Sequence, residues 1–163
     1  MGNASNEYLR NAILTASPEQ LHLMLYDGAI RFTRQGIEGI ETKNWEKAFT
    51  GFSRAQKILL EMLNSLNYDV DRELCTRMAG LYNYIYRHLV QACSERSVPA
   101  AEEALKFLNY QRETWVMLME KLRQERAGQS DTPGVRTPPA QSPASADSTG
   151  EVDTEYSTLC VEG

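Results

Sequence analysis

The sequence predicts an all-α protein: an antiparallel up-down-up-down four-helix bundle with a short N-terminal covering segment and a disordered C-terminal tail. Apolar residues recur at helical spacing through most of the chain, and no alternating run indicates a strand. Short connections rich in Asn, Asp, Ser and Pro separate the long periodic segments, and such connections place successive helices antiparallel. We therefore expect a covering segment over residues 1–16, a bundle over 17–126 and a tail over 127–163.

The first helix of the bundle is expected to begin after Ser17 and to end near Glu41. Ser17 can cap it, Pro18 suits the first helical position, and Gln20 completes a capping box. Residues at helical spacing predict which face of this helix is buried in the bundle. This expected core stripe consists of Leu21, Leu25, Gly28, Ala29, Phe32 and Gly36.

The other three helices of the bundle show equally clear boundaries. Asn44 can cap the second helix, which is expected to end near Leu66. Asp71 can cap the third, which should end near Glu95, and the fourth should continue to about Arg126. Their expected core positions are Trp45, Ala48, Phe49, Phe52, Ala55, Leu59, Leu63 and Leu66, then Leu74, Met78, Leu81, Ile85, Leu89 and Ala92, then Ala101, Ala104, Leu105, Leu108, Trp115, Met119 and Leu122.

A second apolar stripe runs along the first helix of the bundle and consists of Leu23, Tyr26, Ile30 and Ile37. At about 100° per residue these positions lie roughly opposite the expected core stripe. Because a helix of a four-helix bundle buries one face, something else must cover the second. Two explanations stay open: the apolar residues 8–14 cover this face, or it forms a groove for a partner segment.

The composition of residues 127–163 differs sharply from that of the bundle. Pro, Ser, Thr, Ala and Gly dominate, and too few large apolar groups are present to offset the entropy of ordering, which predicts disorder. This tail holds one of the 17 basic residues and six of the 22 acidic ones, so the formal charge of −5 arises from it. The remaining residues are neutral overall. A nucleic-acid or anionic-membrane binder needs a basic face, so we expect no nucleic acid and no direct membrane binding.

The chain shows neither a signal-peptide pattern nor a run of about 20 apolar residues, which would be needed to span a bilayer. Its three cysteines, Cys75, Cys93 and Cys160, do not have metal-ligand spacing. Such sparse cysteines suit a reducing compartment. We therefore expect a cytoplasmic protein.

The sequence predicts no enzyme, no metal and no cofactor. Its two histidines are His22 and His88, and no nucleophile or phosphate-binding motif is present. Glu19 and His22 form one Glu-x-x-His motif of the kind used by di-iron bundles, but Ile85 stands where His88 would need its glutamate. We expect Glu19 to favour the positive end of the helix and His22 to be an ordinary surface or boundary residue.

The run Thr15–Ile30, TASPEQLHLMLYDGAI, resembles the signature of the flagellar secretion chaperone family FliS. Tyr8, Ile13 and Thr15 match the N-terminal pattern of that family. Ser65–Asn67, Leu81–Ala92 and Arg112–Trp115 are similar to its later signatures, and the resemblance covers about Tyr8 to Arg123 in the right order. Asn83 replaces a common Asp, His88 replaces a usual basic residue, and the tail is not part of the family pattern.

The resemblance implies an export chaperone that binds the disordered C-terminal segment of flagellin. Such a protein prevents premature polymerisation, delivers its client to the flagellar type III export apparatus, and contacts a component of the export gate. By this resemblance Tyr8 and Ile13 belong to a movable cover, and Leu23, Tyr26, Ile30 and Ile37 form a groove surface. Tyr84, Tyr86 and Arg87 are further expected flagellin contacts.

A second function fits the residues without the family resemblance. A generic four-helix adaptor that binds another flagellar or regulatory protein would need the same bundle and the same surplus apolar surface. The two functions differ only in the partner, which the physical pattern of one sequence does not name.

Overall fold

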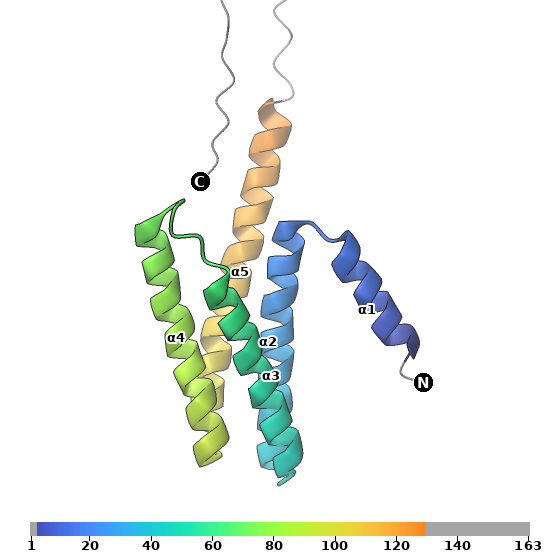
Figure 1. Ribbon diagram of the computed structural model, residues 1–163, viewed down its shortest axis with the longest axis vertical. Coiled ribbons are helices and arrows are strands. Elements are labelled where there is room, and N and C mark those ends of the chain that lie inside the picture. The colour runs from blue at the N-terminus through green and yellow to red at the C-terminus, as the bar shows by residue number, and fades with distance from the viewer. Residues whose placement is uncertain (1–2, 130–163) are drawn as a thin grey trace, which may run out of the picture. The chain divides into compact units, whose positions relative to one another are not determined.

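The computed structural model describes residues 3–129, which form five α-helices and, within this range, no strand (Figure 1). The helices are α1 (Asn3–Thr15), α2 (Pro18–Glu41), α3 (Trp45–Asn64), α4 (Arg72–Glu95) and α5 (Val98–Gln129). The first three residues of the predicted tail continue α5, and the rest of the tail lies outside the described residues.

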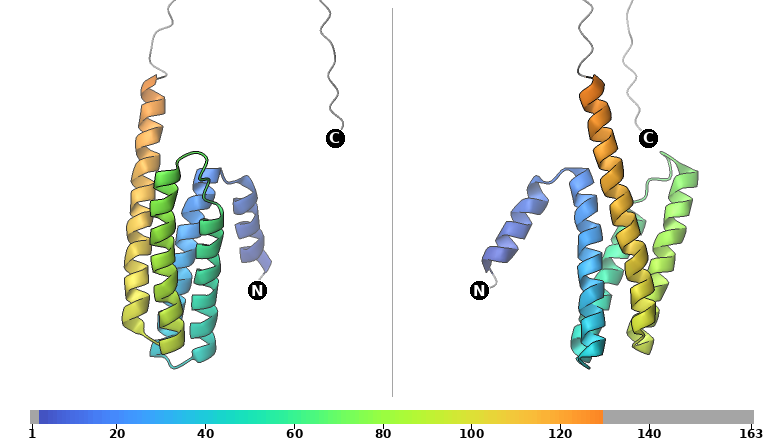
Figure 2. Two further views of the ribbon diagram at one scale, coloured as in Figure 1. Left: turned by 60° about the vertical axis from the view of Figure 1, so that its left-hand side comes forward. Right: turned by 180° about the vertical axis from the view of Figure 1, so that it is seen from behind.

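Helices α2 to α5 form the expected antiparallel four-helix bundle. α2 packs against α3 and α5, and α4 packs against the same two helices, so the four stand at the corners of a closed ring (Figure 2). This up-down-up-down order follows from the short connections between them. The predicted fold class is therefore confirmed.

The polar residues at the starts of the helices cap them as expected. The Ser17 hydroxyl accepts the backbone N–H of Gln20 at 3.2 Å, and the Gln20 side-chain oxygen accepts the N–H of Ser17 at 3.0 Å. Asn44 and Asp71 each accept a backbone N–H three residues on, at 3.0 and 2.9 Å. Each cap satisfies a donor that has no partner within the helix, which fixes where the helix begins.

Glycines allow α2 and α3 to approach each other closely. A Cβ placed on Gly39 would lie 2.3 Å from the backbone nitrogen of Ala48, and one on Gly51 would lie 2.6 Å from the nitrogen of Gly36. Because no side chain fits in these gaps, glycine is required for this backbone contact despite its cost of about 1 kcal/mol in a helix. The α2–α3 pair is thus the most tightly joined side of the bundle at these positions.

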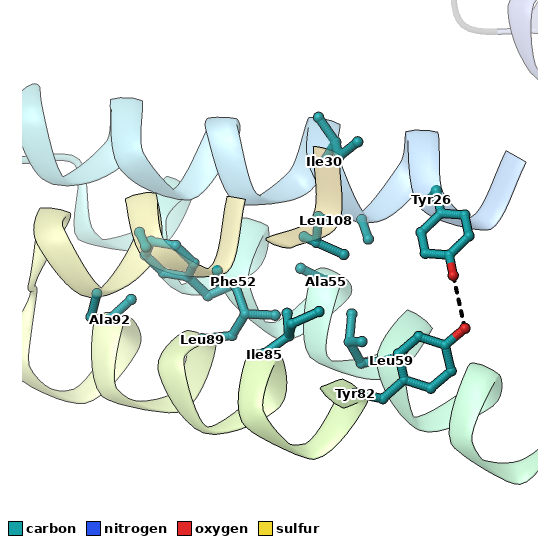
Figure 3. Packing of buried hydrophobic residues seen from close by; sticks show 14 of the residues in the cluster. Tyr26, Ile30, Phe52, Ala55, Leu59, Tyr82, Ile85, Leu89, Ala92 and Leu108 are labelled. Atoms are coloured by element: carbon teal, nitrogen blue, oxygen red, sulfur yellow. Dashed lines mark hydrogen bonds between the residues drawn. The ribbon is translucent and has the colours of Figure 1, made fainter. Parts of the chain in front are cut away.

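The core lies along the axis of the bundle and receives side chains from all four of its helices (Figure 3). Phe52, Leu59, Ile85, Leu89 and Leu108 are fully buried, as predicted. Alanines from all four helices fill the narrow spaces between them: Ala29, Ala55, Ala92, Ala101 and Ala104 have no exposed surface. Burial of one large apolar side chain contributes about 1.5–3 kcal/mol, so this layer supplies much of the stability.

Four predicted core residues are wrong: Trp45, Phe49, Leu74 and Leu122 are 42%, 64%, 55% and 39% exposed. Trp45 and Phe49 lie near the start of α3, where the Arg96 guanidinium covers the Trp45 ring at 4.0 Å from its centre. Leu74 lies in the first turn of α4, and Leu122 in the last turns of α5. A periodic pattern does not show where the neighbouring helices end, so it does not distinguish these terminal positions from core positions.

The predicted division of α2 into a core face and an opposite surface face is also wrong. Tyr26 and Ile30 are 1% and 5% exposed and belong to the core, whereas Leu25 and Phe32 of the expected core stripe are only partly buried. The buried face lies between the two apolar stripes and is centred on Thr33, whose hydroxyl donates to the Ala29 carbonyl at 2.8 Å. A polar residue at the centre of the buried arc made one wide face resemble two.

Candidate functional site

A pocket of about 330 Å³ opens at the end of the bundle where α2 and α4 begin. We call it the end pocket. Its lining comes from three helices and one connection: His22 and Tyr26 of α2, Leu66 after α3, Leu74, Cys75, Met78 and Tyr82 of α4, and Gln111, Thr114, Trp115 and Leu118 of α5. Most of these side chains are apolar or aromatic, which is typical of a site that takes apolar groups.

The pocket exists because α3 ends early. α3 stops at Asn64, and residues 65–71 cross to the start of α4 without regular helix. Of this connection only Leu66 reaches the lining, and the Asn67 carbonyl accepts the Cys75 thiol at 3.3 Å. At this end of the bundle, α2, α4 and α5 surround a space that α3 occupies further along the bundle axis.

The floor of the end pocket is a pair of buried tyrosines. The hydroxyls of Tyr26 and Tyr82 lie 2.8 Å apart and share a hydrogen bond between α2 and α4 (Figure 3). Burial raises the pKa of both phenols, so both are neutral at physiological pH. The hydrogen bond satisfies the two hydroxyls within an otherwise apolar layer and joins helices at diagonal corners of the ring.

The α2–α5 wall of the pocket is aromatic and firmly held. The Trp115 indole N–H donates to the Glu19 carbonyl at 3.1 Å, and the His22 ring lies 4.4 Å from the Trp115 ring and 5.0 Å from that of Tyr26, centre to centre. Burial lowers the pKa of His22 because the charged imidazolium loses hydration there. Next to this wall, Arg112 pairs with Asp27 and ties α5 to α2 at the surface. His22 is a boundary residue, as expected.

Exposed apolar residues surround the mouth of the pocket. Leu74 and Leu118 line the pocket yet are 55% and 45% exposed. α5 continues past the start of α2 (Figures 1 and 2), and Leu122, one turn after Leu118 on α5, is 39% exposed as well. A second hollow of about 260 Å³ lies between the start of α2 and the last turns of α5, where Met119 and Leu122 supply its apolar surface. Apolar surface gathered in this way commonly marks a protein interaction site.

The nine predicted site residues are not gathered in one place. Tyr26 lines the end pocket, Ile30 is core, and Leu23 and Ile37 are partly buried. On α4, the Tyr84 hydroxyl donates to Glu103 at 3.3 Å, Tyr86 packs against the core and Arg87 is exposed. On α1, Tyr8 and Ile13 are 77% and 45% exposed.

The residues at the mouth of the pocket were missed by sequence reasoning. Helical spacing places Leu74 in the expected core stripe and gives Leu118 no role. One signal was available: the last predicted helix is longer than its neighbours, so the apolar residues of its final turns have no helix opposite them. A predicted difference in length between neighbouring helices therefore indicates exposed apolar surface on the final turns of the longer helix.

Among residues 3–129, no group of three or more His, Cys, Asp or Glu side chains is placed to hold a metal ion. No helix within that range is both long and apolar enough to cross a membrane.

Comparisons with known proteins agree with this architecture. The family of the flagellar protein FliS matches residues 1–122. The flagellar secretion chaperone FliS of Bacillus subtilis is 32% identical over 126 residues, which cover 77% of this chain and 93% of that protein. The protein of the same name from Campylobacter jejuni is 28% identical over 112 residues, covering 69% and 88%.

A solved structure shares the fold. The crystal structure of a bacterial flagellar chaperone superposes with a TM-score of 0.60 at 21% identity and covers 72% of this chain and 96% of that one. The relatives are named as chaperones, which agrees with the prediction that the chain is not an enzyme. On the extent of the family match and of the identity to its relatives, this chain belongs to the FliS family.

Proposed function

We propose that this protein is a cytoplasmic export chaperone that binds the C-terminal segment of flagellin, prevents its premature polymerisation and delivers it to the flagellar type III export apparatus. The observation that carries the proposal is the end pocket with its exposed apolar rim, Leu74, Leu118 and Leu122. Membership of a family whose curated relatives are named flagellar secretion chaperones supports the choice of client.

Binding at this site requires no chemical energy source. Apolar side chains of the client that enter the end pocket are removed from water, and each large one contributes about 1.5–3 kcal/mol. Part of this gain offsets the entropy lost when a disordered segment becomes ordered. A client with several apolar anchors, spread from the pocket onto the last turns of α5, therefore fits the site better than one with a single anchor.

We propose that α1 is the movable cover of this site. Its apolar side chains Tyr8, Leu9, Ile13 and Leu14 are all at least 40% exposed, so they are available for a contact. Only Ala16 and Ser17 separate α1 from α2, and the pocket residue His22 lies one turn into α2. In this proposal α1 competes with the client for the same apolar surface, and its removal strengthens client binding.

The other predicted contacts keep their roles as proposals, with one exception. Tyr26 acts as the floor of the pocket, and Leu23, Ile37, Tyr84, Tyr86 and Arg87 extend the contact along the bundle. Ile30 is excluded from the contact because it is buried in the core and, unlike Tyr26, does not line the end pocket. A component of the export gate is the proposed second partner, which receives the loaded chaperone.

Calorimetric titration with the C-terminal segment of flagellin from the same organism tests the proposal. One-to-one binding with a negative heat-capacity change is expected, because apolar surface is buried. If the folded protein does not bind at tens of micromolar, the flagellin assignment fails and a four-helix adaptor with a different client becomes the better interpretation.

A further inference from the structure

The two histidines of the chain have different surroundings. His22 lines the end pocket and contacts the Trp115 and Tyr26 rings. His88 lies on α4, where its Nδ1 is 2.9 Å from the Tyr84 carbonyl oxygen, and it is not part of the pocket lining. A pH effect on the pocket can therefore be assigned to His22 if it is lost when His22 is replaced and kept when His88 is replaced.

The groups around His22 leave a positive charge on its ring poorly compensated. From α2 the pocket contains Tyr26, and from α4 it contains Cys75 and Tyr82, whereas α5 contributes Gln111, Thr114, Trp115 and Leu118, none of which titrates. Burial raises the pKa of both phenols, whereas His22 is the imidazole of the lining, a group that ordinarily titrates at about 6.5.

The nearby carboxylates are paired elsewhere or form no ion pair with the His22 ring. Asp27 pairs with Arg112. Glu19 lies one turn before His22 and lines the second hollow, and no carboxylate of residues 3–129 forms an ion pair with His22. Protonation of His22 would thus place a charge in an apolar wall without a carboxylate partner.

We propose that His22 makes the end pocket sensitive to pH: the pocket accepts an apolar group while the imidazole is neutral and loses affinity for it when the imidazole is protonated. The inference rests on the proposed role of the end pocket as an apolar binding site, and it adds a control on when that site is open to a client. As a direct consequence, the end pocket releases its client in an acidic environment.

The direction follows from linkage between binding and protonation. Burial already lowers the pKa of His22 in the empty pocket. An apolar occupant removes further water from the ring, which lowers the pKa of His22 again. At a pH below the pKa of the empty pocket, binding of the occupant therefore requires that His22 release a proton. Affinity is then constant above the pKa of the empty state and falls below it, by up to about tenfold for each pH unit until the pKa of the occupied state is reached.

The test uses the full chain and N-phenyl-1-naphthylamine, an uncharged apolar fluorophore. Its dissociation constant is measured from pH 7.5 to pH 5.0 for the wild type, His22→Gln, His22→Phe and His88→Gln, with circular dichroism confirming the fold at each pH. Two-dimensional NMR of the histidine side chains gives the pKa of His22 with and without the fluorophore.

We expect the affinity of the wild type and of His88→Gln to fall several-fold toward pH 5, whereas either His22 variant that folds shows a flat profile. The pKa of His22 should decrease when the fluorophore binds. A flat wild-type profile, a pH effect that persists in the His22 variants, or no binding at any pH would overturn the inference. Flagellin binding at pH 7.5 is measured separately, so loss of the proposed client and loss of the pH control are distinguishable.

Discussion

The hydroxyls of Tyr26 and Tyr82 meet at 2.8 Å across the diagonal between α2 and α4, and neither side chain has more than 1% of its surface exposed. This contact is the floor of the end pocket and marks the level at which the packed core ends. A buried hydroxyl without a partner costs about 1–3 kcal/mol, so the two residues depend on each other.

Removal of one hydroxyl of this pair should therefore destabilise the fold. Tyr82→Phe is expected to lower the free energy of unfolding by about 1–3 kcal/mol, because the Tyr26 hydroxyl is left buried and unpaired. Urea unfolding measures the change. The double variant Tyr26→Phe, Tyr82→Phe should lose clearly less than the sum of the single changes, and Tyr110→Phe, at a residue that is 63% exposed, serves as the control. Additive losses would show that the two hydroxyls are not coupled.

Two glycine substitutions with opposite expected signs test the close contact of α2 and α3. Gly39→Ala should destabilise the protein by about 1–3 kcal/mol, because the added methyl group collides with the backbone of Ala48. Gly80→Ala should stabilise it by about 0.5–1 kcal/mol, because a methyl group at this position of α4 meets no neighbouring atom within 4 Å. Thermal and urea unfolding report both changes. A neutral Gly39→Ala would contradict the tight backbone approach.

Stability should depend on pH through His22. Burial lowers the pKa of His22 in the folded state relative to the unfolded chain, where a histidine titrates at about 6.5. The unfolded state therefore binds the proton more tightly, and the stabilising effect of the neutral ring is complete above about pH 6.5 and is lost as the pH falls toward the folded-state pKa. His22→Gln should lose less stability than the wild type between pH 7.5 and pH 5.5. Equal losses would show that the ring is solvated in the folded state.

Ile30 distinguishes core from surface on α2. Because its side chain is only 5% exposed, Ile30→Asp places an uncompensated charge in the core and should abolish or strongly weaken folding. Far-ultraviolet circular dichroism and thermal unfolding measure this. Leu23→Asp, at a partly buried position of the same helix, should be tolerated better. A fully folded Ile30→Asp protein would restore the two-face interpretation of α2 that the burial of Tyr26 and Ile30 contradicts.

The fold could be predicted in detail because its determinants are local. Ser17, Asn44 and Asp71 cap helices through hydrogen bonds to residues three positions away, so sequence spacing alone locates the helix starts. The site could not be predicted to the same extent because it depends on where helices end relative to one another. Leu74 and Leu118 are exposed since α3 stops at Asn64 and α5 continues past its neighbours, and periodicity within one helix carries no such information.

The central claim is that the end pocket and its rim hold the C-terminal segment of flagellin. Leu118 and Met117 test it as a matched pair, because they are adjacent on α5 and 45% and 66% exposed, yet only Leu118 lines the pocket. We would measure the affinity of the flagellin segment for Leu118→Asp and Met117→Asp by calorimetry, with unfolding curves as the control for stability. The account predicts at least a tenfold loss for Leu118→Asp and a change of less than threefold for Met117→Asp. Equal affinities for the two folded variants and the wild type would contradict it and would place the client elsewhere on the bundle.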